Sequence, residues 1–449
     1  MPEPLHKPAG QTWLIISHAF NMDGRAASQT ITDKIPYLIE KGIVPIVISA
    51  QTGEKDSALE HYQVPAIAPS GLKFDLRHIL KKHFRNPASY RLAKGLANVL
   101  LLPLYFVERA FIHLESQWSW FFMAYLKGCR IAREKRPLLI YSTGGANSAH
   151  FAGYLLAKKF SIPWIAELHD PMIHGDWRGT GTAYKWAAYL ERKICERADA
   201  AWWFTEGALA KALARNPTLG NRGYMIIPGV QEPDFQGVVY RRQEKVHFGH
   251  FGSLAETRNL AVFIEALYRL LQDYPEYKRL VQVDIYGAHL DSLSRKALQQ
   301  FPLQEVVVEH GRLESNPLTG KSGRQQVLEA MRQVDALILL HGSDPFCEEY
   351  IPSKLFEYLW SKRPIIGLIW NNQQLTKILQ QRGQISLNAL DVKGLKDALY
   401  LLLKKWEAGE LTDCETLAPF TVQNAVDKIV EIAASVAREP RKREDRPVS

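Results

Sequence analysis

The sequence predicts an α/β protein with two parallel-sheet domains. Short apolar or β-branched runs bounded by turn residues alternate with longer helix-like stretches. This alternation is interrupted by a polar, charged segment and then starts again. The 449 residues are also too many for one hydrophobic core. Alternating strands and helices imply parallel sheets that are covered by helices on both faces.

The first half of the chain contains six strand-like runs separated by helix-like patterns. The runs cover residues 12–18, 44–49, 138–143, 163–168, 200–205 and 224–229. The helical patterns cover residues 26–41, 88–135, 147–160 and 184–198. We therefore expect a Rossmann-like domain over residues 1–232, followed by a linker over 233–245 whose composition is typical of a domain boundary.

The second half repeats the pattern. Strand-like runs cover residues 246–254, 281–287, 306–311, 336–342 and 364–369, with a helix from about 259 to 273. These elements predict a second Rossmann-like domain over residues 246–420. A helix over 421–437 follows, and the charged, proline-containing residues 438–449 are expected to be a disordered tail.

Composition favours a globular protein of a reducing compartment. Hydrophobic residues make up 46% of the chain and charged residues 23%. The four cysteines are far apart, so neither a zinc site nor a disulfide framework is indicated. No signal peptide is apparent, and the longest apolar run, 96–107, contains Pro103 and is too short to span a bilayer. We expect a cytoplasmic protein.

The net charge of +9 is concentrated in one segment. Residues 73–136 hold thirteen Lys or Arg and four Asp or Glu, and they include the aromatic run "WSWFFMAYL" at 118–126. Basic residues beside apolar blocks suit an anionic membrane surface. An ordinary set of helices packed on a sheet, with solvated charges outside, explains the aromatic run equally well. No nucleic-acid-binding motif accompanies the charge, so a nucleic-acid partner is not expected.

In open α/β sheets, ligands bind beyond the carboxyl ends of the strands, so polar and small residues there are candidates. In the first half, Asp23 and Gly24 follow the first strand, and Gly144 and Gly145 follow the strand at 138–143. Glycines there permit close approach of a ligand, or serve turn geometry alone. His169 and Asp170 follow the strand at 163–168 as an acid–base candidate and its neighbour, or as a structural histidine and a turn.

In the second half, Gly252 and Ser253 end a strand and Arg258 follows six residues after the glycine. Exposed backbone amides and a guanidinium suit phosphate oxygens, whereas the alternative is a surface arginine at a helix start. Ser353 after Pro352 predicts a helix N-cap and an anion site at the helix start. Glu357 lies one turn further, where a carboxylate can accept from sugar hydroxyls or pair with Lys354.

The stretch "CEEYIPSKLFEYLWSKRPII", residues 347–366, carries a family resemblance. Glu349 and Glu357 have the Glu-x7-Glu spacing of group 1 glycosyltransferases, and "PSKLFEYL" occurs in one branch of that family. "FGSLAETRNLAVFIEAL", "VLEAMRQVDALILL" and "PWIAELHDP" also resemble it, and the likeness spans residues 12–69 and 137–437. The resemblance implies the GT-B fold, in which two Rossmann-like domains face each other across a cleft, and a retaining sugar transfer.

The resemblance also implies roles for residues. Glu357 would bind the ribose of a nucleotide-sugar donor, Glu349 its sugar hydroxyls, and Arg258 the diphosphate. His169 would lie near the transferred sugar. The remaining implied donor-binding residues are Gly252, Ser253, Ser353, Lys354 and Leu355, and an acceptor or diphosphate loop would comprise Asp23, Gly24, Gly144, Gly145 and Asp170. Two departures stand out: Ser253 replaces a usual basic residue, and Tyr-Ile-Pro follows Glu349 in place of Gly-Phe-Gly.

We therefore expect a metal-independent hexosyltransferase without a cofactor that acts on a lipid-linked or polysaccharide-type acceptor in cell-envelope synthesis. No Asp-x-Asp metal motif stands on a loop, and no nucleophile is evident. The basic segment 73–136 motivates the lipid-linked acceptor and a peripheral place on the cytoplasmic membrane face. The alternatives are a non-catalytic nucleotide-sugar-binding protein, which the Ser253 departure allows, and a GT-B nucleotide-sugar epimerase.

Overall fold

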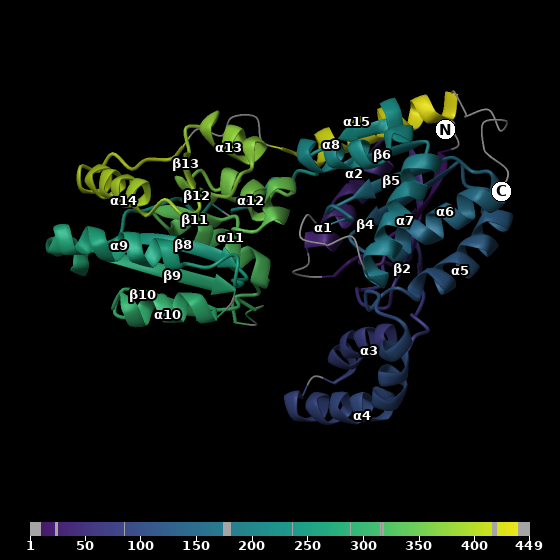
Figure 1. Cartoon of the computed structure of the whole chain (residues 1–449), viewed down its shortest axis with the longest axis horizontal. Helices are drawn as coiled ribbons and strands as arrows, with labels where there is room; N and C mark the ends of the chain where they lie inside the picture. Colours follow the sequence, from purple (N-terminus) through teal and green to yellow (C-terminus); the bar gives the residue numbers. More distant parts are fainter. Residues whose placement is uncertain are drawn as a thin grey trace, which may run out of the picture. The chain divides into compact units, whose positions relative to one another are not determined.

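The computed structural model describes residues 10–22, 26–84, 86–173, 181–235, 237–287, 289–314, 316, 318–414 and 420–438. The chain forms two compact units (Figure 1). The first comprises Met1–Gly229 together with Thr421–Ser449, and the second comprises Val230–Phe420. The C-terminal segment therefore returns to the first unit after the second is complete.

The first unit is built on a seven-stranded sheet in the order β3-β2-β1-β4-β5-β6-β7. All neighbouring strands pair in parallel. Because both faces are covered, the inner strands are apolar on both sides, as "WLII" and "WIA" show. The strands are β1 Gln11–Ile16, β2 Ile43–Ser49, β3 Glu60–Gln63, β4 Leu139–Gly144, β5 Trp164–Leu168, β6 Ala200–Trp203 and β7 Gly223–Met225.

Helices cover both faces of this sheet. One core joins α5 and α6 to the sheet through Trp120, Leu156 and Trp164, and the other joins α2 and α15 to it through Leu38, Trp202 and Val426. The helices of this unit are α1 Ala26–Thr32, α2 Lys34–Glu40, α3 Pro69–His83, α4 Pro87–Phe111, α5 Trp120–Lys135, α6 Asn147–Phe160, α7 Thr182–Arg197, α8 Glu206–Arg215 and α15 Val422–Arg438, with a 3-10 turn η1 Pro217–Arg222.

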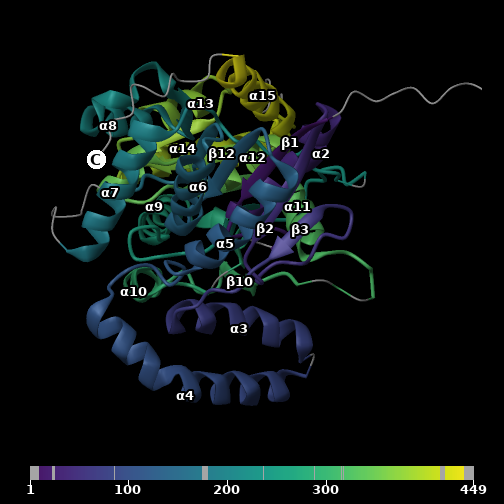
Figure 2. The same cartoon turned by 90° about the vertical axis from the view of Figure 1, so that its right-hand side faces the viewer.

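Helices α3 and α4 form a hairpin that extends away from the sheet (Figures 1 and 2). Its base is held by the buried carboxylate of Glu108 in α4. Oxygens of that carboxylate accept from the Ser70 backbone N–H at 2.7 Å, the Ser70 hydroxyl at 2.6 Å and the Trp118 indole at 2.7 Å. A carboxylate at the start of α3 also suits the helix dipole. Within the described part of the chain, no helix has the length and hydropathy of a membrane span.

The second unit has a six-stranded sheet in the order β10-β9-β8-β11-β12-β13, again parallel throughout. Its core includes Phe248, Leu267 and Ile338. The strands are β8 Val246–Gly252, β9 Val281–Gly287, β10 Val307–Gly311, β11 Ala336–Leu340, β12 Ile365–Ile369 and β13 Ile385–Asn388. The helices are α9 Ala261–Asp273, α10 Ser292–Gln300, α11 Gly323–Gln333, α12 Lys354–Trp360, α13 Gln373–Gln380 and α14 Val392–Glu407, with 3-10 turns η2 Pro275–Arg279 and η3 Pro345–Glu349.

The predicted class, two parallel α/β sheets in sequence, is confirmed. The residues of the predicted linker lie on the second unit, where the Arg363 guanidinium stacks 3.4 Å from the Tyr240 ring centroid and Gln333 Nε2 donates to the Val239 carbonyl at 3.0 Å. Helix α15 ends at Arg438, and the predicted tail beyond it lies outside the described residues. The sequence prediction omitted β3 and β13, whose short, half-polar sequences "EHYQ" and "ISLN" lack an apolar run.

Candidate active site

The second unit places its candidate residues at a reversal of strand order. From β8 the chain proceeds outward to β9 and β10, and from β11 it proceeds outward in the opposite direction. Such a switch point leaves a crevice at the carboxyl ends of the two central strands, where open α/β sheets bind ligands. Gly252 and Ser253 lie at the end of β8, and His341 and Gly342 follow β11.

Gly252 makes room for the ammonium group of Lys354. A Cβ atom added to Gly252 would lie 2.2 Å from Lys354 Nζ, which is inside van der Waals contact. Gly252 also has φ +124°, a conformation that side chains disfavour. The glycine at the end of β8 therefore lets helix α12, about one hundred residues later, place a cation against the strand end.

Arg258 supplies a second cation at the same loop. Its Nη2 donates to the Ser253 hydroxyl at 2.9 Å and its Nε to the Ser253 carbonyl at 3.2 Å. Its Nη1 lies 3.5 Å from the Tyr350 hydroxyl, which itself donates to the His341 carbonyl at 2.5 Å. Ser253, the position where the family usually has a basic residue, thus orients Arg258. Tyr350 and His341 tie this arginine to the end of β11.

Lys354 is buried beside a second cation. Burial, followed by the positive charge of Arg258, lowers the pKa of Lys354 to about 7, while Glu357 opposes the change. Among the described residues, no carboxylate forms an ion pair with either Lys354 or Arg258. A diphosphate bound here would supply the missing counter-charge and restore the ordinary basicity of the lysine.

Helix α12 differs from the expectation at its first turn. Ser353 has helical dihedral angles, φ −56° and ψ −31°, and its side chain makes no capping hydrogen bond. The helix has seven residues, so its aligned backbone dipoles add little, and the local positive charge comes from Lys354 and Arg258. Leu355 is fully buried and anchors the helix in the domain core.

Glu357 and Glu349 occupy different environments. Glu357 is half-buried and its Oε1 lies 3.5 Å from Arg324 Nη2 of helix α11. No ion pair joins Glu357 to Lys354, so the alternative of a simple Lys354–Glu357 surface pair does not apply in the described structure. Glu349 is the last residue of η3 and is 1% exposed. The loop that carries it is held by Asn372, whose Nδ2 donates to the Cys347 and Tyr350 carbonyls at 3.0 and 2.9 Å.

The first unit contains a separate buried cluster around Glu167 on β5. Burial alone would raise the pKa of Glu167, but Lys34 and His169 hold it well below its ordinary value. The carboxylate is therefore ionised and saturated with donors. The donors are Lys34 Nζ at 2.5 Å, the Tyr141 hydroxyl at 2.8 Å, Trp202 Nε1 at 3.0 Å, the Thr143 hydroxyl at 2.7 Å and His169 Nε2 at 2.9 Å.

His169 is oriented by this cluster. Because Thr143 donates its hydroxyl proton to Glu167, we assign the proton of the imidazole to Nε2, where it faces the carboxylate. The ring stacks on Phe204 with centroids 4.8 Å apart. No described residue hydrogen-bonds to Nδ1, which faces away from the carboxylate. A histidine held in one tautomer by a buried carboxylate is suited to hydrogen-bond a substrate.

The other predicted residues of the first unit lie at the same sheet edge where the structure describes them. Gly144 ends β4 with φ +118°, and a Cβ on Gly145 would lie 3.6 Å from Asp170 Oδ2. Gly144, Gly145, His169 and Asp170 therefore gather beyond β4 and β5. Asp23 and Gly24 lie outside the described residues.

Solved structures provide the comparison. A TarM mutant from S. aureus in complex with fondaparinux, alpha-GlcNAc-glycerol and UDP has a TM-score of 0.60 at 9% identity, and the match covers 96% of this chain and 100% of that one. The chain has the GT-B fold. An α,α-trehalose-phosphate synthase (UDP-forming) from Burkholderia vietnamiensis has a TM-score of 0.61 at 13% identity, covering 96% and 98% of the two chains.

The GT-B neighbours include more than one activity. A putative UDP-N-acetylglucosamine 2-epimerase from Listeria monocytogenes matches with a TM-score of 0.51 at 10% identity, covering 98% of this chain and 100% of that one. No protein-family model and no curated protein matches the sequence. At these identities the similarity establishes the fold, and the chemistry must be argued from the residues themselves.

Several residues of both clusters were missed by sequence reasoning. Arg324 and Tyr350 reach the donor-side residues from α11 and from the loop after η3. Lys34 and Glu167 form the buried pair of the first unit. Only Glu167 had a detectable signal, since a carboxylate inside the apolar strand "WIAEL", two residues before His169, lies on the same strand face as that histidine.

Proposed function

We propose that the protein is a retaining glycosyltransferase of the group 1 type that transfers a hexosyl unit from a nucleotide diphosphate sugar. One observation supports it most: Arg258 and Lys354 converge on Gly252 at the switch point of the second GT-B domain without a paired carboxylate. Two basic side chains without a paired carboxylate at this position suit a diphosphate. The TarM mutant was solved with UDP, the trehalose-phosphate synthase is UDP-forming, and the Listeria protein is a putative UDP-N-acetylglucosamine 2-epimerase, which supports a uridine diphosphate sugar as the donor.

In the proposed reaction, the bond between the sugar C1 and the diphosphate oxygen breaks and a bond to an acceptor oxygen forms. Negative charge develops on the leaving phosphate, and positive character develops on the sugar. Arg258 and Lys354 stabilise the leaving group as charged hydrogen-bond donors. Removal of one preorganised donor of this kind costs about 100- to 1,000-fold in rate. We assign no protein nucleophile.

The remaining donor contacts follow from the positions of the two glutamates. Glu357, oriented by Arg324 at 3.5 Å, is proposed to accept hydrogen bonds from the ribose hydroxyls. Glu349 is proposed to contact the donor sugar. The backbone of Ser353 and Leu355 completes the donor side together with Ser253. In the first unit, His169 is proposed to hydrogen-bond the transferred sugar through Nδ1, and Asp23, Gly24, Gly144, Gly145 and Asp170 to form the acceptor or diphosphate loop.

We further propose a metal-independent reaction without a cofactor. Lys354 and Arg258 provide the positive charge that a divalent cation provides in metal-dependent transferases. Sugar transfer measured with excess chelator should equal transfer measured with added Mg²⁺ or Mn²⁺. A loss of transfer in chelator that Mg²⁺ or Mn²⁺ restores would contradict this part of the proposal.

The acceptor is proposed to be lipid-linked or a polysaccharide, in keeping with a role in cell-envelope polysaccharide synthesis at the cytoplasmic membrane face. Support comes from the basic segment 73–136, which the structure forms into α3, α4 and α5. The aromatic run contributes to both the core and the surface. Trp120 is fully buried and its Nε1 donates to the Val64 carbonyl at 3.0 Å, whereas Phe122 and Leu126 are 44% and 47% exposed.

The test is hydrolysis or transfer measured over a panel of UDP-sugars. We expect release of UDP by the wild-type protein and a loss of at least about 100-fold in Arg258→Ala and in Glu357→Ala. Arg269→Ala is the control, because Arg269 pairs with Glu265 on the surface of the same domain. Unchanged activity in both site variants would overturn the assignment.

Two alternatives are separated by the same experiment. An epimerase, as one structural neighbour is described, would yield an isomeric nucleotide sugar or release UDP without an acceptor-dependent product. A non-catalytic nucleotide-sugar-binding protein would bind UDP-sugars in calorimetry, and binding would weaken in Arg258→Ala, but no turnover would be detected.

A further inference from the structure

Helix α4 turns its apolar residues toward solvent, whereas a surface helix normally turns them toward the protein core. Nine of its large apolar side chains are between 41% and 79% exposed. They are Leu92, Leu96, Val99, Leu100, Leu102, Leu104, Phe106, Val107 and Phe111. Single exposed apolar residues are ordinary, but a face of nine such residues between Leu92 and Phe111 marks an interaction surface.

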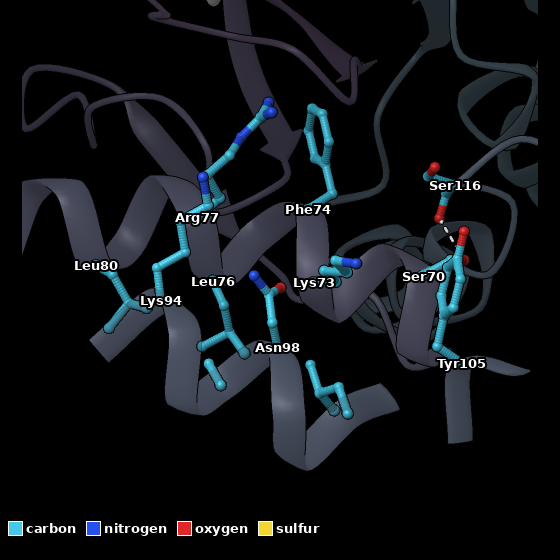
Figure 3. Close-up of a pocket in the computed structure, with 12 residues that line it drawn as sticks. Ser70, Lys73, Phe74, Leu76, Arg77, Leu80, Lys94, Asn98, Tyr105 and Ser116 are labelled. Carbon is cyan, nitrogen blue, oxygen red and sulfur yellow. Dashed lines mark hydrogen bonds between the residues drawn. The ribbon is translucent and has the colours of Figure 1, made fainter. Parts of the chain in front are cut away.

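The opposite face of α4 turns toward α3 and is polar or amphipathic. Lys94, Asn98 and Tyr105 of α4 line a pocket between the two helices together with Lys73 and Arg77 of α3, and the Arg77 side chain extends away from α4 beside Phe74 (Figure 3). The pocket has a volume of about 440 Å³ and is open to solvent. Three basic side chains therefore line the pocket together with apolar ones such as Leu76, Leu80 and Leu101, while the exposed face of α4 is apolar.

The cations of this pocket have no acidic partner. Lys73 Nζ lies 4.9 Å from the Tyr105 ring centroid, and the Arg77 guanidinium lies 5.2 Å from the Phe74 ring centroid. Over the described residues, no ion pair is formed by Lys73, Arg77 or Lys94. The two carboxylates of the hairpin, Asp75 and Glu108, are buried and hydrogen-bonded to backbone groups instead. Three uncompensated cations in one pocket are complementary to an anion such as a phosphate.

We propose that the α3–α4 hairpin is a membrane-docking element: the pocket of Lys73, Arg77 and Lys94 binds the phosphate headgroup of an anionic lipid, and the outer face of α4 enters the acyl boundary beside it. A helix with one apolar face and basic residues on the other lies in the plane of a bilayer interface. Headgroup phosphates and acyl chains lie next to each other in a lipid, as the pocket and the apolar face of α4 do. A tyrosine, here Tyr105, is suited to the headgroup level because its ring is apolar and its hydroxyl polar.

This proposal concerns the acceptor of the proposed function. It rests on that function only in taking the lipid phosphate held here to be part of the acceptor. Binding itself needs neither donor nor turnover. Vesicle binding therefore tests the hairpin, while UDP release tests the donor site, and either can fail alone.

The first experiment measures flotation of the full chain with vesicles of phosphatidylcholine alone or with phosphatidylglycerol added. The double variant Lys73→Gln, Arg77→Gln is compared with Lys393→Gln, Lys405→Gln, which removes the same charge from exposed positions of the second unit. At about 1 kcal/mol for each basic residue near an anionic surface, we expect the hairpin variant to lose about 30-fold in affinity and the control to lose less than about twofold. Equal losses of vesicle affinity in both variants would overturn the proposal that the pocket binds a lipid phosphate.

The second experiment tests the apolar face. Leu96→Asn with Leu100→Asn should abolish vesicle flotation, whereas Leu390→Asn with Leu401→Asn, at exposed leucines of the second unit, should leave it unchanged. Inorganic phosphate and glycerol 3-phosphate should not displace the protein from vesicles at concentrations equal to the lipid phosphate. Flotation unaffected by the hairpin substitutions, or self-association through α4 without lipid binding, would refute membrane docking.

Discussion

Lys354 is the residue whose chemistry depends most on its neighbours. The family resemblance makes Lys354 a candidate donor-binding residue, and the folded chain sets its ammonium against Gly252 and beside Arg258. The lowered pKa, about 7, makes this lysine responsive to an anion in the physiological range. Two substitutions, one at Lys354 and one at Gly252, therefore test the donor site directly.

The first prediction concerns the pH dependence of UDP binding. A bound diphosphate raises the pKa of Lys354 above its value of about 7 in the free protein. Below that value the lysine is already charged. Above it, binding must take up a proton, so affinity falls as pH rises, by at most about tenfold per pH unit. Calorimetry between about pH 7 and about pH 9 in buffers of different ionisation enthalpy should detect the uptake. Lys354→Met should remove it, and uptake that persists in this variant would contradict the assignment.

The second prediction concerns Gly252→Ala. The added Cβ would occupy the position of the Lys354 ammonium, and φ +124° is strained for alanine. We expect a loss of about 1–2 kcal/mol in the free energy of unfolding and of about tenfold or more in UDP affinity. Gly383→Ala is the matched control, because Gly383 has φ +64° with no atom within 4 Å of an added Cβ. The control should lose stability but keep UDP affinity, as measured by urea unfolding and calorimetry.

Among the elements, α2 and β5 are joined by the buried pair of Lys34 and Glu167. Both side chains are at most 1% exposed. A buried pair is a weak source of stability compared with apolar residues of the same size, but removing one partner leaves a charge without compensation. The pair holds α2 on the sheet and keeps Glu167 ionised beneath His169.

The third prediction follows from that geometry. Lys34→Met should cost about 3–5 kcal/mol in the free energy of unfolding, measured with urea, because Glu167 loses its buried counter-charge. Lys41→Met, which breaks the half-exposed pair of Lys41 with Asp427 in the same unit, should cost about 1 kcal/mol or less. A loss in Lys34→Met that is no larger than in Lys41→Met would show that Glu167 does not depend on this lysine.

Prediction at the element scale succeeded where apolar runs were long. The patterns at 147–160 and 281–287 coincide with α6 and β9. The continuous helical pattern at 88–135 is instead two helices, α4 and α5, separated by residues 112–119. Periodicity alone did not reveal this break. The helical turns on both sides of residues 112–119 have the same 3.6-residue spacing of apolar residues, although the two helices run in different directions. The edge strands β3 and β13 were missed because one side of such a strand has no neighbour and tolerates polar residues, whereas the edge strands β7 and β10 were predicted.

At the scale of the whole molecule, each unit has its own core. Helix α15 comes from the end of the chain but packs on the first unit, with Val426 and Ile429 fully buried against α2 and the sheet. The chain therefore crosses twice between the units, near residues 229 and 421. Ligands of one unit should stabilise that unit selectively.

The fourth prediction uses this division. Thermal unfolding should show two transitions, and UDP should raise the one that belongs to the second unit, by about 2.7 kcal/mol at a ligand concentration of 100 times Kd. Arg258→Ala should abolish this shift. Ile429→Ala should lower only the other transition, because it leaves a cavity between α15 and the first sheet and costs about 2–5 kcal/mol. If UDP instead raises the transition that Ile429→Ala lowers, UDP binds the first unit, and the assignment of the donor site to the second unit is wrong.

The sequence by itself determined the fold class and most strands of both sheets, since these depend on local apolar runs, and it singled out the stretch around Glu349 and Glu357 by spacing within one segment. Features that depend on contacts between distant parts of the chain were decided only by the tertiary structure. It brought Lys354 to Gly252 and Lys34 to Glu167, returned α15 to the first unit, and turned the apolar stripe of α4 outward. A helical sequence pattern indicates that α4 has an apolar stripe. Whether that stripe faces solvent depends on which face of α4 packs against α3.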